Sequence, residues 1–273
     1  MIFDTHAHYD DESFDNDREA LLNRLKENGI GRVVNVGASM RGAKDTWQLM
    51  QDYDFIYGAI GIHPDCVGEL DEEKMEQLRT MLSHEKAVAV GEIGLDYYWD
   101  KESHVLQKKW FARQMDLALE MQLPIVVHSR EAAKDTFDAT REYHAGKPGF
   151  RGGIIHCFSG SVEMAREYVK LGYYIGIGGV VTFKNARVLK EVAADIPLER
   201  IVVETDCPYL APVPNRGKRN SSLYLPYVIE EIARIKEITP DEVERVTYEN
   251  ALKVYNIEGK KSDGKVIKST ENH

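Results

Sequence analysis

Long apolar segments are absent from this sequence of 273 residues, because no run approaches the roughly 20 residues that a helix needs to cross a bilayer. The first residues, Met1 to His6, contain neither a basic region nor an apolar core, so we expect no signal peptide. Hydrophobic residues make up 43% of the chain and charged residues 29%, which is typical of a globular protein in water. We therefore expect a cytoplasmic protein without attachment to a membrane.

Cysteine is scarce, with only Cys66, Cys157 and Cys207. Their number is odd and no Cys-x-x-Cys pair exists, which argues against a disulfide framework and against a zinc ribbon. We interpret all three as reduced thiols, and Cys157 and Cys207 as thiols that pack at the ends of strands.

Positive charge is also in short supply, since the formal net charge is −10 at pH 7. This balance argues against a protein that coats nucleic acid through a broad basic face. It does not exclude an enzyme that acts on nucleic acid, because two bound divalent cations would place about four positive charges where a phosphate needs them. The composition leaves the substrate open.

A Gly-x-Gly-x-x-Gly turn after the first strand-like segment is missing, which argues against a dinucleotide-binding sheet. The sequence instead alternates short, mostly apolar segments with amphipathic ones. Uniformly apolar segments are typical of parallel strands that are covered on both faces. The predicted strands are Met1–His6, Gly31–Gly37, Phe55–Ile62, Ala87–Glu92, Pro124–His128, Gly152–His156, Tyr173–Gly178 and Arg200–Glu204.

The amphipathic segments between these strands predict helices. They are Asn16–Asn28, Asp71–His84, Ser103–Met121, Glu131–Tyr143, Ser161–Leu171, Asn185–Ala194, Leu223–Ile238 and Pro240–Tyr255. Eight strands alternating with helices over about 200 residues favour an α/β fold, a (β/α)8 TIM-type barrel with additional C-terminal helices. A doubly wound open sheet is the competing architecture.

The sequence predicts a single domain, which we place at residues 1–257. From Gly259 onward the chain is polar and aperiodic, so we expect residues 258–273 to form a flexible tail. We find no internal repeat beyond the alternation of strands and helices.

Two histidines stand at the end of the first predicted strand, in Asp4-Thr5-His6-Ala7-His8. Side chains at positions i and i+2 of an extended strand point the same way, so the imidazoles of His6 and His8 can converge on one ion. The spacing alone also occurs without a metal, and the remaining strand ends decide between the two interpretations.

Ionisable residues also stand at four other predicted strand ends, namely Glu92, His128, His156 and Asp206. The carboxyl ends of the strands share one face of a parallel barrel, and barrel enzymes build their active sites on that face. A carboxylate or imidazole at the end of an apolar strand is costly unless it is paired, hydrogen-bonded or bound to metal. One such residue suggests a satisfied buried polar group, whereas five strand ends together indicate a metal site.

The number of ligands indicates the number of ions. Four histidines and two carboxylates exceed what one tetrahedral zinc needs, and they suit two divalent cations that share a carboxylate. Glu92 is the predicted bridge because it is central in the set. The other ligands divide into His6, His8 and Asp206 for one ion, and His128 and His156 for the second. Imidazole suits Zn²⁺, Mn²⁺ and Ni²⁺, whereas Mg²⁺ prefers oxygen.

The six-residue pattern occurs together with four longer motifs, which are Gly61-Ile62-His63-Pro64, Gly91-Glu92-Ile93-Gly94-Leu95-Asp96-Tyr97, Ile155-His156-Cys157-Phe158-Ser159-Gly160 and Glu204-Thr205-Asp206-Cys207-Pro208-Tyr209-Leu210. In this order they resemble the TatD family of metal-dependent deoxyribonucleases, relatives of the amidohydrolases. The resemblance covers residues 1–257 and implies a (β/α)8 barrel with a binuclear site. It also implies exonuclease-type hydrolysis of DNA phosphodiester bonds with Mg²⁺ or a similar ion, and the ligand roles carry over to all six residues.

The implied substrate is DNA, as single strands or as ends, and no membrane or obligate protein partner is implied. One departure from the family pattern lies in the loop from Asn215 to Ser222. Family members commonly have a proline two residues after the second asparagine of this loop, where this chain has Ser222. The conformation of the loop therefore does not follow from the resemblance.

Two further sites flank the expected metals. His63, before Pro64 at the end of the third predicted strand, is predicted to contact the substrate phosphate or to transfer a proton; a hydrogen-bonded residue of the rim is the alternative. Arg216, Lys218 and Arg219 follow the last strand on the same face, and we predict that they bind substrate phosphate. A solvated loop is the alternative for these three cations.

The expected reaction is attack of a metal-activated water on phosphorus, with Asp206, Glu92 and His63 as the catalytic residues. Asp206 is the candidate general base because it can bind metal and also accept the proton of the water. Three alternatives stay open: a hydrolase of phosphotriesters, lactones or amides, an aminoacyl-tRNA deacylase, and a non-catalytic binding protein. Hydrolases of the first kind often bridge their metals with a carboxylated lysine at the fourth strand, so Glu92 favours the nuclease-like branch.

Overall fold

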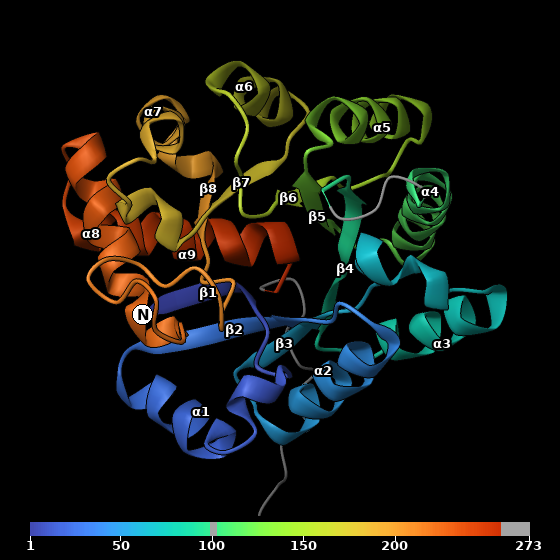
Figure 1. The fold of residues 1–273 in the computed structure, drawn as a ribbon, viewed down its shortest axis with the longest axis horizontal. Coiled ribbons are helices and arrows are strands. Elements are labelled where there is room, and N and C mark those ends of the chain that lie inside the picture. Colours follow the sequence, from blue (N-terminus) through green and yellow to red (C-terminus); the bar gives the residue numbers. More distant parts are fainter. Residues whose placement is uncertain (99–102, 258–273) are drawn as a thin grey trace, which may run out of the picture.

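The computed structural model describes residues 1–98 and 103–257, and these form a barrel of eight parallel strands with helices around it (Figure 1). Each strand pairs with the next one in the sequence. The strands are β1 (Ile2–Ala7), β2 (Ile30–Val36), β3 (Ile56–Ala59), β4 (Ala87–Asp96), β5 (Ile125–Arg130), β6 (Gly153–Ile155), β7 (Tyr174–Ile177) and β8 (Ile201–Val203).

The first and last strands meet at their carboxyl ends. The N–H of Asp206 donates to the carbonyl of His6 at 2.9 Å, and the N–H of His8 donates to the carbonyl of Cys207 at 2.9 Å. These bonds nearly close the barrel, and the predicted (β/α)8 fold is confirmed. The open sheet is thereby excluded.

Nine α-helices of the described ranges cover the barrel. They are α1 (Arg18–Glu27), α2 (Met40–Asp52), α3 (Glu72–Leu82), α4 (His104–Met121), α5 (Ala133–Gly146), α6 (Val162–Lys170), α7 (Arg187–Asp195), α8 (Leu225–Lys236) and α9 (Pro240–Tyr255). Short 3-10 helices are η1 (Glu12–Phe14), η2 (Pro64–Glu69), η3 (Gly179–Thr182), η4 (Leu198–Arg200) and η5 (Ser222–Tyr224). Within the described ranges, none of the helices combines the length and the apolarity that a membrane crossing requires.

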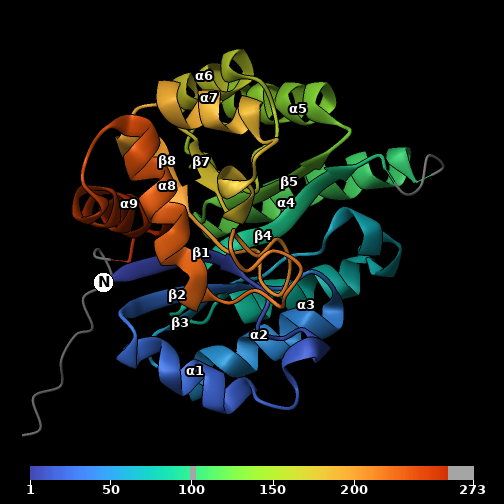
Figure 2. The same ribbon diagram turned by 60° about the vertical axis from the view of Figure 1, so that its left-hand side comes forward.

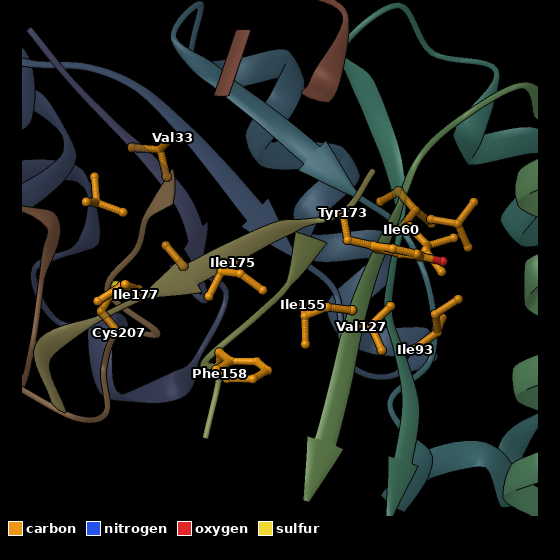
Figure 3. Close-up of a cluster of buried hydrophobic side chains, with 14 of the residues drawn as sticks. Val33, Ile60, Ile93, Val127, Ile155, Phe158, Tyr173, Ile175, Ile177 and Cys207 are labelled. Atoms are coloured by element: carbon orange, nitrogen blue, oxygen red, sulfur yellow. The ribbon is translucent and has the colours of Figure 1, made fainter. Parts of the chain in front are cut away.

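Two hydrophobic clusters hold these layers together. The larger one lies between strands and helices, and Figure 3 shows a row of it, with Ile93 of β4, Val127 of β5, Ile155 of β6 and Ile175 of β7. These four residues are register partners in consecutive strand pairs. The smaller cluster joins side chains such as Phe3 of β1 to the last turns of α9. The helix α9 therefore packs against the barrel opposite the end where β1 and β8 exchange hydrogen bonds.

The predicted elements differ from the structure in three places. The strand β4 runs on to Asp96, so Glu92 lies inside the strand and does not end it. The third strand ends at Ala59, and His63 instead precedes η2. The helix α2 was not predicted, although Ser39 caps it by accepting from the N–H of Gly42. The predicted tail, residues 258–273, lies outside the described residues.

Candidate metal centre

The row of apolar side chains that faces the helices fixes the direction of the neighbouring polar residues. Successive side chains of a strand point to opposite faces. Ile93, Val127 and Ile155 pack outward in the larger cluster, and Glu92, His128 and His156 are their immediate neighbours in the sequence. Alternation therefore turns these three polar side chains toward the inside of the barrel at its carboxyl end.

The carboxylate of Glu92 is the centre of this arrangement. Its Oε1 lies 2.8 Å from Nδ1 of His128 and 2.8 Å from Nε2 of His156. Its Oε2 lies 3.5 Å from Nε2 of His6 and 3.8 Å from Nε2 of His8. The two oxygens of one carboxylate thus face two different pairs of imidazoles.

Asp206 completes the set from the far side of the barrel seam. Its Oδ1 lies 3.3 Å from Nε2 of His8 and 3.6 Å from Nε2 of His6. The ring of His6 also stacks on the ring of His156 with 3.8 Å between the centroids. The structure therefore brings all six predicted ligands together, with side chains that are at most 18% exposed.

Both carboxylates are held in the ionised form. Burial disfavours the charge of Glu92, but the charge of His156 and the hydrogen bonds from its imidazole neighbours outweigh burial, and the pKa of Glu92 lies well below its usual range. Burial also opposes the charge of Asp206, and the hydrogen bond from His8 with the charges of the histidines lowers the pKa of Asp206. Two buried anions at this place require positive charge beside them.

The imidazoles respond in the opposite direction. Burial opposes protonation of His8, but the hydrogen bond and charge of Asp206 outweigh it and raise the pKa of His8 to about 9. Burial is likewise outweighed at His156, where the charge of Glu92 raises the pKa well above the ordinary value. Protons on these rings supply the positive charge that bound cations would supply, so the donor set fits divalent metal ions.

Several neighbours orient the imidazoles. Nδ1 of His8 lies 2.8 Å from the carbonyl oxygen of Val36, which leaves Nε2 for the centre. Nε2 of His128 lies 2.9 Å from Oδ2 of Asp96, which leaves Nδ1 for Glu92. Our sequence prediction missed Asp96. It stands four residues after Glu92, so an extended strand places both on one face, and the longer β4 would have revealed it.

Glu204 is a second carboxylate that the sequence prediction missed. It is fully buried, its Oε1 accepts the N–H of Cys157, and the same oxygen lies 3.7 Å from Nδ1 of His156. Glu204 stands directly after β8 and two residues before Asp206 in the same motif, and this position could have identified it as a residue of the site. Glu204 supports the backbone and the ring on which one side of the centre depends.

Among residues 1–98 and 103–257, four groups of three side chains have donor atoms within 4.8 Å of one another. They are His6–His156–Asp206, His6–His8–Glu92, His63–Glu92–His128 and His63–Asp65–Asp96. The first three share members with the predicted ligands and describe one continuous centre. The fourth extends it toward the end of β4.

His63 lies at the rim of this centre, where its side chain is 15% exposed. Its Nε2 is 3.9 Å from Oε1 of Glu92, and its ring contacts the ring of His128 edge-on with 4.3 Å between centroids. Nδ1 accepts the N–H of Asp65 at the start of η2. Burial lowers the pKa of His63 to about 4, so the ring is neutral at pH 7 and Nε2 is directed toward the centre.

The basic loop, residues 215–222, contacts parts of the chain other than the six predicted ligands. The guanidinium of Arg219 donates to Asp17 at 2.8 and 2.6 Å and to the carbonyl of Ser13. Arg216 lies over the ring of Phe183. Lys218 donates to the side chain of Asn215 in the same loop. Within the described part of the chain, these contacts tie the loop to its neighbours and not to the six ligands.

The same loop explains the departure from the family pattern. The N–H of Ser222 donates to the hydroxyl of Tyr9 at 2.9 Å, and its Oγ donates to Oδ2 of Asp4 at 2.6 Å. A proline has neither donor. Asp4 also accepts the hydroxyl of Thr205, so Ser222 joins the loop to a buried network beneath His6. Figure 2 shows the loop lying against the segment that follows β1.

A barrel that carries imidazoles and carboxylates at its carboxyl end has the features of metal-dependent barrel hydrolases. Comparisons with known proteins agree. The family model described as TatD related DNase matches residues 3–256. A Bacillus subtilis (strain 168) protein, the uncharacterized metal-dependent hydrolase YabD, is 45% identical over 257 residues, which are 94% of this chain and 100% of YabD.

Two Escherichia coli K12 relatives give the same result. The uncharacterized metal-dependent hydrolase YcfH is 34% identical over 261 residues, which cover 94% of this chain and 97% of YcfH. The crystal structure of YjjV, a TatD homologue, matches with a TM-score of 0.87 and 30% identity, covering 93% of this chain and 98% of YjjV. The chain belongs to the TatD family of metal-dependent hydrolases, and the predicted resemblance is confirmed.

Proposed function

We propose that this hydrolase cleaves phosphodiester bonds of DNA from an end, using two divalent cations that Glu92 bridges. One observation supports it most directly: the two oxygens of Glu92 face two different imidazole pairs. A carboxylate in that position is the usual link between two ions in one site. One ion would bind His6, His8 and Asp206, and the other would bind His128 and His156.

The ions would be Mg²⁺ in function, or Mn²⁺, Zn²⁺ or Ni²⁺, which imidazole ligands suit. Bound there, they supply Lewis-acid polarisation of the phosphate and lower the pKa of a bound water toward 7. The residues of the chain provide the rest. Asp206 is ionised and more exposed than Glu92, so it accepts the proton of the attacking water. Nδ1 of neutral His63 accepts the N–H of Asp65, so the ring proton is on Nε2, which donates a hydrogen bond to the phosphate from the rim.

DNA is favoured as the substrate for two reasons. The matching family model is described as TatD related DNase, whereas the names of YabD and YcfH specify no substrate. A chain of net charge −10 also has little to attract a polyanion except bound cations, and the centre concentrates them at one point. Arg216 and Lys218, exposed on the loop after β8, would contribute a weaker attraction.

The function is tested with single-stranded and double-stranded DNA of defined length, incubated with Mg²⁺ or Mn²⁺. We expect release of nucleotides from an end and complete loss of release with a chelator. Hydrolysis of aminoacyl-tRNA or of a lactone, with no release of nucleotides under any of these metals, would reject the proposal in favour of another hydrolase.

The bridging role of Glu92 is tested separately by metal titration. The Glu92→Gln variant keeps the size of the side chain and loses its charge, so we expect both ions to bind more weakly than in the unchanged protein. The matched control is Glu69→Gln, a partner of the Met40 N–H away from the centre. Two ions bound to Glu92→Gln with unchanged affinity would exclude the bridge.

A further inference from the structure

A cavity of about 420 Å³ opens beside the metal centre, on the side of β7 and β8. Its inner end is formed by Glu204, Thr205 and Asp206, and its outer wall by the first turn of α7. The volume falls within the range of about 300–1,000 Å³ that is usual for small-molecule sites. None of the residues that we predicted for substrate binding lies on it.

The walls of this cavity are mainly apolar. Phe158 follows β6 and is buried, Val180 belongs to η3, and Leu210 follows β8. Val188 of α7 stands at the mouth with 40% of its surface exposed. Apolar walls suit the face of a planar ring, because burial of that face from water is favourable.

The cavity is continuous with the reacting end of the centre, because Asp206 lines both. A group attached to a phosphate at the ions would therefore reach into the cavity without leaving the protein. Arg187 and Asn185 also line the cavity beside α7, but the walls next to Asp206 include Phe158, Val180 and Leu210, and these apolar surfaces favour the uncharged base of a nucleotide as the occupant.

We propose that this cavity binds the terminal nucleoside of the substrate, with its base between Phe158, Val180 and Leu210. The inference rests on the proposed function and adds the place where the released nucleotide is held. The first turn of α7 forms the outer wall, so it stands beyond a nucleoside bound in the cavity. This wall favours a chain end at the bound nucleoside, and hence cleavage from that end.

The test combines a filled cavity with a substrate that lacks the terminal base. In Val188→Trp the larger side chain occupies the mouth. We expect kcat/KM on a linear oligonucleotide to fall about tenfold or more, in line with the stacking of one base. An oligonucleotide that is abasic at both ends should be cleaved equally by Val188→Trp and by the unchanged protein. This substrate has no terminal base, so the variant has no contact between base and cavity left to remove.

Val213→Trp is the matched control, since Val213 is 46% exposed on the loop after β8 and does not line the cavity. It should cleave both oligonucleotides like the unchanged protein. An equal loss by Val188→Trp on normal and abasic ends would overturn the subsite, as would cleavage of circular single-stranded DNA. Absence of cleavage of any oligonucleotide by the unchanged protein would instead reject the proposed function.

Discussion

At the scale of single residues, Asp206 takes part in more features of the site than its neighbours do. It faces two imidazoles of the centre, lines the adjoining cavity, and donates its own N–H to the backbone of His6. Its carboxylate is ionised, with a lowered pKa, and 18% exposed. An ionised acceptor at the edge of a metal centre is suited to take a proton from water.

The Asp206→Asn variant should therefore lose turnover by about 10²–10⁴-fold, which is the usual contribution of general base catalysis. The backbone bond to His6 does not depend on the side chain, so the variant should stay folded. Single-turnover hydrolysis and circular dichroism would measure the two effects. Asp45→Asn on the exposed face of α2 is the control, and turnover of Asp206→Asn equal to that control would remove Asp206 from the role of base.

The sequence was sufficient to predict that the six candidate ligands meet, because each stands at or near the carboxyl end of a mostly apolar strand segment. It was insufficient for Asp96, because its contact with His128 depends on how far β4 extends beyond Glu92. The sequence also could not predict the direction of the Arg219 side chain. Its partner Asp17 follows β1, whereas Arg219 follows β8, and only the fold brings these two segments together. Spacing predicts which residues share a strand face, and only packing decides which loops meet.

At the scale of elements, the loop between β8 and α8 depends on its bond to the first strand. Ser222→Ala removes the hydroxyl that donates to buried Asp4 and that also contacts the hydroxyl of Tyr9, and it leaves the N–H bond to Tyr9. We expect the free energy of unfolding to fall by about 1–2 kcal/mol, because a buried carboxylate loses one donor. Urea denaturation would measure the change, with Ser221→Ala beside it as the control. Equal stability of the two variants would contradict the importance of this bond.

The helices α7 and α8 are joined by a charge cluster with a predictable pH dependence. Glu231 accepts from Arg234 and lies 2.9 Å from Nζ of Lys190, and these cations lower the pKa of Glu231 to about 2. The folded pKa is lower than that of the unfolded chain, so the stabilisation is present above about pH 4.5 and disappears as the pH falls toward 2.

Glu231→Gln should therefore lower the free energy of unfolding at pH 7 by about 1 kcal/mol after allowance for solvent screening. The difference from the unchanged protein should shrink as the pH is lowered from 5 to 3. Denaturation at a series of pH values would show it, with the exposed neighbour Glu230→Gln as the control. A difference that is independent of pH would exclude the ion pairs as its source.

The helix α2 shows why one element escaped prediction. Its first turn contains Gly42, and glycine has a low helix propensity. The structure explains this glycine, because a Cβ there would lie 2.9 Å from Oδ2 of Asp10. A residue that lowers helix propensity therefore lies where the helix packs against Asp10.

At the scale of the whole molecule, the candidate metal centre links five strands across the barrel, since its predicted ligands come from β1, β4, β5 and the ends of β6 and β8. Ions that bind only the folded chain stabilise it by mass action. At a free metal concentration of 100 times Kd, we expect about 3 kcal/mol of added stability. Thermal unfolding with and without a chelator would measure it, and an unchanged midpoint would contradict metal binding at the centre.

The junction of β1 with β8 and the contact of α9 with β1 also determine when the protein can fold. The N–H of Asp206 reaches the carbonyl of His6 across 200 residues, and the hydroxyl of Tyr255 reaches the carbonyl of Thr5 across 250. During synthesis the first strand can pair with β2 early, but its bonds to Asp206 and Tyr255 form only after almost the whole described chain has left the ribosome. The last helix of the described ranges, α9, packs against Phe3 of β1, so a chain that stops before α9 leaves this part of the apolar interior exposed to water.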